Sequence, residues 1–397
     1  MQTRLLLAWQ ICGVSESATP PESVVTMGSA VGERAWQPEV LRLNALCPYY
    51  TMFPVDFPLS VLPAARSDGW VLDPFCGRGT TLFAARLRGR PCAGIDVNPV
   101  AAALAKAKLV DIHAETVIGL CRRLLHCDAP RVEVPRDPFW GWCFHPDTLV
   151  EICVIRLALL NAPDTAASIA LRALMLGILH GPLRPSRMYL SNQMPRTYAT
   201  KPAAAIRYWE RHELRPPRIG VLETVRRRAR YSLAQLPRKV PGWVVQGDAT
   251  EVLERCDQKF ATVITSPPYF GMQTYLPDQW LRAWFLGGPP TPVYSAADQL
   301  PQGSQSQFVE ALARVWRSTA AHCSPGATLV VRFGTLPSRS IDAEGLFRRS
   351  LSTADAGWQI TSMRPAGSPP KGRRQADQFT VSTALTSEFD CTAVLSS

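Results

Sequence analysis

The chain has 397 residues, of which 46% are hydrophobic and 19% are charged, and its mean hydropathy is -0.02. These values are typical of a globular protein and exclude a solvated, disordered chain. No run approaches the roughly 18 apolar residues of a membrane-spanning helix. The length fits one large domain with an insertion, or two domains.

The chain begins with a single arginine, a short apolar run and a Ser/Pro-rich stretch that precedes Met27. This pattern resembles a weak secretion signal, but we expect residues 1–26 to be a disordered or wrongly assigned tail. Eleven cysteines occur singly, without a Cys-x-x-Cys pair. Such spacing argues against a metal site or a disulfide framework and favours a reducing compartment, the cytoplasm by default.

Residues 69–81 predict a buried strand, a Gly-containing turn and the start of a helix that stops at Gly89. A second strand ends on Asp96. Asn98 then caps another helix, with Pro99 at its first position. Alternating strands and helices at this spacing predict a parallel α/β sheet.

Helical patterns fill residues 112–241, and strand patterns return afterwards. We therefore predict one doubly wound, mostly parallel α/β domain, formed by residues 27–111 and 242–397, which a helical insertion interrupts. The strands expected in its second part are 242–249, 259–269 and 326–334, followed by an antiparallel pair at 357–367 and 378–386.

The net charge of +11 is unevenly distributed. Residues 181–240 contain 14 Arg or Lys and three Glu, so this segment carries the entire excess. A concentrated positive charge indicates a surface for a polyanion such as nucleic acid. The alternative is a solvated helical face, which usually mixes both signs.

Three features fall at the predicted carboxyl ends of the strands, where open parallel sheets bind ligands. Gly77 and Gly79 let the backbone approach a ligand closely, although such turns also occur for packing alone. Asp96, 19 positions after Gly77, suits a ribose diol. Asp248 suits an adenine amine or caps its own helix. The phosphate-binding pattern Gly-x-Gly-x-x-Gly and a P-loop lysine are absent, which favours a nucleoside cofactor without phosphates.

Two stretches, "DPFCGRGTT" (73–81) and "TSPPY" (265–269), resemble the cofactor and catalytic motifs of the S-adenosylmethionine-dependent amino-group DNA methyltransferases. "YYTMFPVDFP" (49–58) occupies the place of the segment that flanks the methionine part of the cofactor. The resemblance implies a class I methyltransferase (Rossmann-like) sheet and S-adenosylmethionine as the cofactor. The cofactor-binding residues that it implies are Tyr50, Phe53, Asp73, Phe75, Gly77, Gly79, Thr80, Asp96 and Asp248. The alternative for Phe53 and Phe75 is packing in the core.

The resemblance places the chemistry at Ser266, Pro267, Pro268 and Tyr269. An exocyclic amine is a poor nucleophile because its lone pair is conjugated into the base. Acceptors such as the Ser266 hydroxyl and the Pro267 carbonyl would draw it toward sp³ geometry. Tyr269 would stack on a base flipped out of the duplex. In the family, Ser at the first position goes mostly with cytosine N4 methylation, and adenine N6 remains the alternative.

The cofactor motif precedes the catalytic one, an order in which the intervening segment recognises the target. The resemblance thus implies duplex DNA as the substrate and allows a cognate restriction endonuclease as a partner. The candidate DNA-binding residues are Tyr189, Arg196, Tyr198, Lys201, Arg226, Arg227 and Arg228, with 371–375 as a weaker phosphate contact. An RNA amino-methyltransferase and a catalytically silent nucleic-acid-binding relative are the rival hypotheses.

Overall fold

The computed structural model describes ten stretches of the chain. They are residues 36–47, 53–63, 69–127, 132–181, 189–192, 201–271, 279–293, 300–334, 341–366 and 388–396. The tail expected at residues 1–26 and the basic segment 371–375 lie outside these residues.

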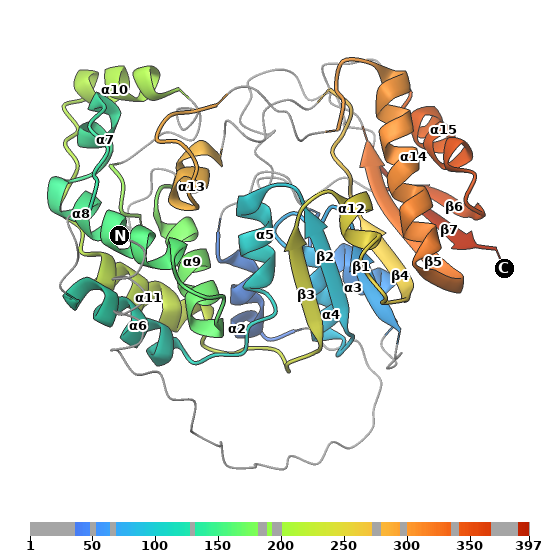
Figure 1. The fold of residues 1–397 in the computed structure, drawn as a ribbon, viewed down its shortest axis with the longest axis horizontal. Helices are drawn as coiled ribbons and strands as arrows, with labels where there is room; N and C mark the ends of the chain where they lie inside the picture. The colour runs from blue at the N-terminus through green and yellow to red at the C-terminus, as the bar shows by residue number, and fades with distance from the viewer. Residues whose placement is uncertain are drawn as a thin grey trace, which may run out of the picture.

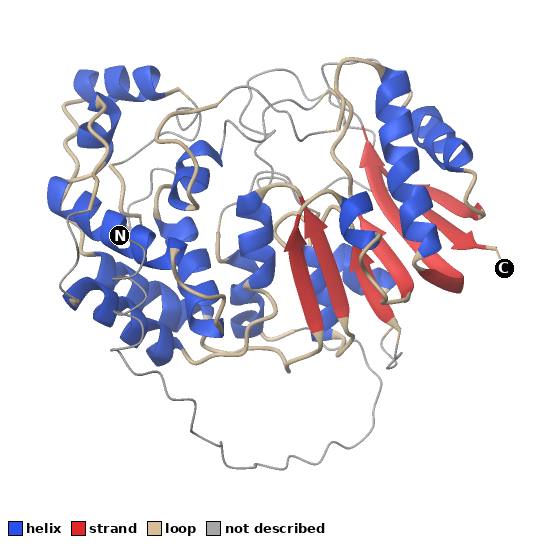
Figure 2. Cartoon of the chain, in the orientation of Figure 1, coloured by secondary structure: helices blue, strands red, loops and turns tan. Residues whose placement is uncertain are grey.

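Seven strands form one sheet in the order β3-β2-β1-β4-β5-β7-β6 (Figures 1 and 2). The first five in this order are parallel neighbours, and β7 runs antiparallel to both β5 and β6. The sheet confirms the predicted doubly wound, mostly parallel α/β fold of the class I methyltransferase type. Its strands are β1 (Trp70–Asp73), β2 (Cys92–Asp96), β3 (Gly242–Gln246), β4 (Phe260–Thr265), β5 (Cys323–Gly334), β6 (Trp358–Pro365) and β7 (Glu388–Leu395).

The closing antiparallel pair is present, and β6 pairs in it with residues 388–395, later in the chain than the predicted 378–386. The later segment alternates partly exposed and buried residues along its whole length, as a strand with one buried face does. Residues 378–386 lie outside the described residues.

Helices cover both faces of the sheet, because successive strand residues point to opposite sides. Val71 faces one apolar core and its neighbour Leu72 faces the other. The first core holds α3 (Asp56–Val61), α4 (Thr80–Leu87) and α5 (Pro99–Lys106), and the second holds α12 (Ala249–Leu253), α14 (Gln305–Ala321) and α15 (Ala343–Ala354). The predicted start of α5 is confirmed, since the Asn98 side chain accepts from the Val100 N–H with Pro99 at the first position.

The insertion is helical, as predicted, and continues the first core (Figure 1). One more helix, α13, packs on the insertion although it follows the predicted boundary at 242 in the chain. The ring centroids of Trp284 and Trp140 lie 4.3 Å apart, and those of Trp280 and Phe139 lie 5.1 Å apart. The helices are α6 (Ala114–His126), α7 (Pro138–Cys143), α8 (Pro146–Leu160), α9 (Ala166–Ile178), α10 (Pro202–Arg211), α11 (Val221–Ser232) and α13 (Trp280–Phe285), with the short α2 (Pro38–Leu41) and η1 (Arg42–Ala45) beside them.

Both ends of the insertion are held by one buried side chain, Arg86 on α4. Its guanidinium donates to the carbonyls of Lys108 and Val110 before the insertion, at 2.8 and 2.6 Å. It also donates to the carbonyls of Pro237 and Arg238 after the insertion, at 2.7 and 3.2 Å. The chain therefore enters and leaves the insertion at one place beside α4.

Among the described helices, none combines the length and the apolar composition that crossing a membrane requires.

Candidate active site

The polar residues picked out from the sequence gather at one edge of the sheet. Since β1 to β4 run parallel, their carboxyl ends all meet at this edge. The strand order reverses between the central neighbours β1 and β4, and ligands bind in the crevice at such a switch point. The structure thereby brings together the loops that follow Asp73, Asp96 and Thr265.

The loop between β1 and α4 is shaped by two left-handed glycines. Gly77 has φ +50° and Gly79 has φ +81°, values that side chains with a Cβ rarely adopt. At Gly79 a Cβ would also lie 2.8 Å from the Ala105 Cα, so that glycine lets α4 start close to α5. At Gly77 a Cβ would meet no described atom within 4 Å. The Gly77 side of the loop is therefore open to a ligand.

Asp96 connects this loop to the end of β2. One carboxylate oxygen accepts from the Gly77 N–H at 2.8 Å, and the other accepts from the Asn98 N–H at 2.9 Å. Desolvation raises the pKa of Asp96 to about 6 against these two hydrogen bonds, which act to lower it. The residue remains half-exposed. Each oxygen keeps a lone pair, so Asp96 can accept hydrogen bonds from a diol.

Asp73 plays a different part, because its carboxylate is buried and turned toward β4. The Thr265 hydroxyl donates to it at 2.6 Å, and the Phe75 N–H donates at 3.2 Å. Desolvation raises the pKa of Asp73 to about 7, although these hydrogen bonds lower it. The Thr81 hydroxyl adds a second link, to the Ile264 carbonyl at 3.3 Å. The cofactor loop and the end of β4 are thus fastened to each other.

The stretch Ser266–Tyr269 leaves the sheet directly after this link as an irregular segment. Pro267 is buried, whereas Ser266 is half-exposed at the strand end. The Tyr269 hydroxyl donates to Glu388 at 3.0 Å, and its ring lies edge-on to Phe333 at 5.5 Å. The tyrosine is therefore oriented by β5 and β7, on the far side of β4 from the cofactor loop.

Several of the remaining predicted cofactor residues also have structural partners. Asp248 is exposed and caps α12, accepting from the Thr250 N–H at 2.8 Å. Phe75 lies edge-on to Trp316 at 6.4 Å, and Phe53 lies edge-on to Phe57 at 5.1 Å. Both aromatic residues are only partly buried. Thr80, buried, begins α4, and Tyr50 lies outside the described residues.

The predicted DNA contacts separate into different environments. The Arg228 guanidinium donates to the carbonyls of Ala45 and Leu46 at 2.9 and 3.0 Å, and Arg226 pairs with Glu223. The Tyr189 ring packs on Gly181, where an added Cβ would lie 2.0 Å from it. Arg227 and Lys201 are exposed. Arg196 and Tyr198 lie outside the described residues.

Sequence reasoning missed Thr265 and Glu388. Thr265 stands within the quoted "TSPPY", and a hydroxyl at the end of a buried strand was a usable signal. Glu388 lies 119 positions from Tyr269, and no local pattern connects them.

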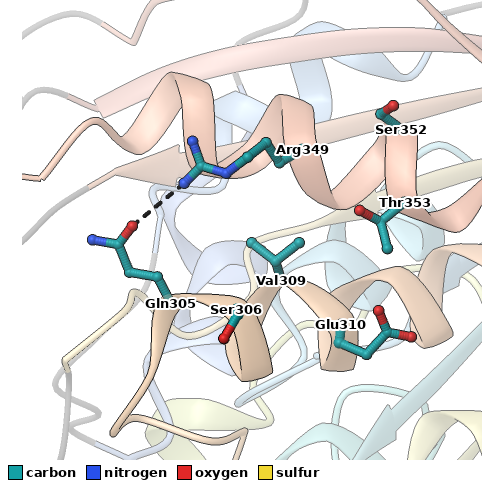
Figure 3. Close-up of a pocket in the computed structure, with 7 residues that line it drawn as sticks. All are labelled: Gln305, Ser306, Val309, Glu310, Arg349, Ser352 and Thr353. Carbon is teal, nitrogen blue, oxygen red and sulfur yellow. Dashed lines mark hydrogen bonds between the residues drawn. The ribbon is translucent and has the colours of Figure 1, made fainter.

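A shallow groove of about 530 Å³ lies between α14 and α15 (Figure 3). Arg349 reaches across it to the Gln305 side-chain oxygen at 3.4 Å. Its other lining residues are Ser306, Val309, Glu310, Ser352 and Thr353. They do not converge on one point, so we assign it no role.

The described residues also contain no His, Cys, Asp or Glu group able to hold a metal ion.

Comparison with known proteins links this site to methyl transfer. Residues 33–107 match the model of a family described as DNA methylase, the N6/N4 methyltransferases. This segment includes the cofactor loop and Asp96 but ends before Ser266, and it is less than a quarter of the chain. A comparison with curated proteins finds no match.

Solved structures give weaker likenesses. An rRNA methyltransferase from Streptomyces viridochromogenes is 15% identical, with 88% of this chain and 87% of that chain covered and a TM-score of 0.32. The magnesium protoporphyrin IX methyltransferase of Synechocystis PCC 6803, solved with bound S-adenosylmethionine, is 10% identical, with 86% and 76% covered and a TM-score of 0.33. Likenesses at such scores carry no information on substrate or residue roles.

The family match covers the segment whose loop and Asp96 form the open side of the site, and it is consistent with an amino-group DNA methyltransferase. Together with the strand order, it indicates an S-adenosylmethionine-dependent methyltransferase with the class I fold.

Proposed function

We propose that this methyltransferase modifies the exocyclic N4 amine of a cytosine flipped out of duplex DNA. The observation that carries the proposal is the junction between β1 and β4. There the Asp73–Thr265 hydrogen bond fastens the Ser266–Tyr269 segment to the cofactor loop. A methyl donor and an acceptor amine held on these two loops would meet at one strand junction, and positioning of this kind supplies much of the rate.

The residues of the loop fit S-adenosylmethionine. The space beside Gly77 is open, and the half-exposed Asp96 has acceptor capacity left for a ribose diol. Phe75 would line the same side, and Asp248 stands at the end of the next strand for the adenine. Gly79, whose Cβ position faces Ala105, would serve the loop by its backbone conformation. When bound, the cofactor supplies an electrophilic methyl group that already carries its leaving group.

The chain's own part in the reaction is to orient the amine. Ser266 and the Pro267 carbonyl offer two oxygens at the end of β4, outside the sheet's hydrogen bonding. Prolines at positions 267 and 268 contribute no N–H that would compete for these acceptors. Tyr269, held by Glu388, would stack on the flipped base.

Serine at position 266 supports cytosine over adenine in this proposal. A serine is a neutral acceptor, whereas an aspartate at this position would accept more strongly, and the Ser form resembles the cytosine N4 enzymes. Because such enzymes commonly protect DNA from a nuclease with the same specificity, the proposal extends to a cognate restriction endonuclease.

The decisive experiment incubates the protein with methyl-labelled S-adenosylmethionine and either duplex DNA or RNA, then digests the nucleic acid to nucleosides. We expect label in N4-methylcytosine from DNA. Label in N6-methyladenine would overturn the choice of base, and label only in RNA would overturn the choice of substrate. Binding without any label would indicate a catalytically silent relative.

The variant that tests the role of the Ser266 hydroxyl is Ser266→Ala. We expect its turnover to fall by roughly 100-fold or more, since it loses an oxygen positioned at the reacting amine. The dissociation constant for S-adenosylmethionine should stay at the wild-type value. If cofactor binding disappeared instead, the division of roles between the two loops would be wrong.

A further inference from the structure

We infer that the exposed cations of α10 contact the phosphate backbone of duplex DNA beside the target base. This surface, termed the α10 stripe, consists of Lys201, Arg207 and Arg211. The inference rests on the proposed function and assigns its substrate contact to one part of the basic segment. It keeps Lys201 from the sequence-based candidates, adds Arg207 and Arg211, and replaces Arg226, Arg227 and Arg228 as the phosphate contacts.

The cations of α11 are largely engaged within the protein. Arg226 pairs with Glu223, and Arg230 donates to Glu115 at 2.8 Å. Arg228 donates to two backbone carbonyls of the segment around Ala45. Contacting a phosphate would require these side chains to give up the partners that they already have.

The α10 stripe is exposed, and its side chains form no ion pair or hydrogen bond with the residues that the structure describes. Positions 207 and 211 are four apart and therefore lie on one side of the helix, with Lys201 preceding its first turn. Nearby, Arg215 is also exposed and lies 4.0 Å over the Trp142 ring. Lys201, Arg207, Arg211 and Arg215 outnumber the two exposed acids beside them, Glu210 and Glu213. This excess of exposed positive charge fits a polyanion.

The opposite side of α10 fixes it to the active-site side of the molecule. Ala205 and Trp209 are buried, and the Trp209 ring lies 5.8 Å from Phe139. Phe139 in turn lies 5.1 Å from Trp280 on α13, the first described helix after the catalytic segment. This row of aromatic rings gives the stripe a packed, indirect connection to the chain that follows Tyr269.

The placement of the two helices agrees with this assignment. In Figure 1, α10 and α13 lie toward the end of the molecule at which the arrowheads of β2 and β3 point. By contrast, α11 lies toward the opposite end. Since the reacting base must enter at the carboxyl edge, α10 is on the correct side to hold the flanking duplex.

The test measures binding of a labelled duplex of mixed sequence to the full chain over a range of salt concentrations. Phosphate contacts are independent of sequence, so no recognition site is needed. We expect Arg207→Gln/Arg211→Gln to reduce the slope of log affinity against log salt by about 2, close to one unit for each contact. The matched control Arg226→Gln/Arg230→Gln removes the same charge from α11, and its slope should stay at the wild-type value.

A slope that falls only in the α11 variant, or equally in both variants, would overturn the inference. So would a wild-type protein that binds structured RNA through the stripe but not duplex DNA. The proposed function is judged separately by the nucleoside digest. If DNA binding depends on salt through α10 but no methyl group is transferred, the phosphate contact is supported and the proposed activity is refuted. If DNA is methylated but the α10 variant keeps the wild-type salt slope, the activity is supported and the phosphate contact is refuted.

Discussion

Two aspartates at the ends of neighbouring strands, Asp73 and Asp96, show how similar positions acquire different roles. Asp73 is buried, and its partner is the Thr265 hydroxyl on the adjacent strand. Asp96 is only partly buried, and its partners are two backbone N–H groups, one for each carboxylate oxygen. A carboxylate at the carboxyl edge of a sheet is therefore not a ligand-binding group by position alone. The hydrogen-bond partners of the carboxylate determine whether it is available to a ligand.

The largest expected difference between Asp73 and Asp96 is in how much each makes the free energy of unfolding depend on pH. Desolvation raises the folded-state pKa of Asp73 from 3.8 to about 7, so the folded protein holds this proton more tightly than the unfolded chain. Stability should therefore fall as pH rises from about 4 to about 7, by an amount on the order of a few kcal/mol. Asp96, with a pKa of about 6, adds a smaller share of the same sign.

Urea unfolding across this pH range measures the effect. Asp73→Asn keeps an oxygen for Thr265 but removes the titration, so its free energy of unfolding should vary much less with pH than that of the wild type. If the wild type and Asp73→Asn show equal pH slopes, Asp73 is not the buried acid that the structure indicates.

The second effect belongs to Asp96 and concerns the cofactor. Asp96→Asn removes the charge and one acceptor oxygen at nearly constant volume. Hydrogen bonds to charged groups contribute about 1.5–3 kcal/mol, so the dissociation constant for S-adenosylmethionine should rise roughly 10- to 100-fold in calorimetry. The matched variant Asp73→Asn should change this constant far less. Equal losses in both variants would remove the distinction between the two aspartates.

The third effect tests the link between β1 and β4. Thr265→Val keeps the shape but leaves the buried Asp73 carboxylate without its closest donor. The free energy of unfolding should fall by about 1–3 kcal/mol, and turnover should fall more than cofactor affinity. Thr265→Ser, which restores the hydroxyl, should recover both quantities. A Ser variant as impaired as the Val variant would point to packing of the methyl group instead.

The smallest effect is expected at Asp248, the third carboxylate of this edge. Asp248→Ala removes the cap of α12 and should cost about 1 kcal/mol of stability. Its effect on the dissociation constant for S-adenosylmethionine should be smaller than that of Asp96→Asn, because Asp248 is exposed and already engaged with Thr250. A larger effect would make adenine binding its principal role.

Local patterns explain which parts of this structure were predictable. The turn at Gly77 and Gly79 and the cap at Asn98 each follow from a few adjacent residues, whereas the strand predicted at 259–269 ends at Thr265, before the two prolines. The contact between Asp73 and Thr265 joins positions 192 apart, and its geometry arises only when β1 and β4 become neighbours. The second strand of the closing pair lies at 388–395, later in the chain than predicted, because 378–386 and 388–395 have a similar polar–apolar mixture.

The basic segment 181–240 was also only partly predictable from the sequence. Composition located the excess positive charge correctly, but it could not tell which cations have partners. Arg228 reaches backbone carbonyls 182 and 183 positions away, and Arg230 reaches Glu115. These pairings depend on how α11 packs against η1 and α6, which a one-dimensional pattern does not contain.

The four carbonyls gathered around Arg86 have a consequence for how this protein changes over time. The insertion leaves and returns at a single point, but it is also tied to α13, whose Trp280 and Trp284 pack on Phe139 and Trp140. A shorter, longer or unrelated segment between Val110 and Pro237 would therefore require a matching change in α13, while the carbonyls that Arg86 holds could stay in place.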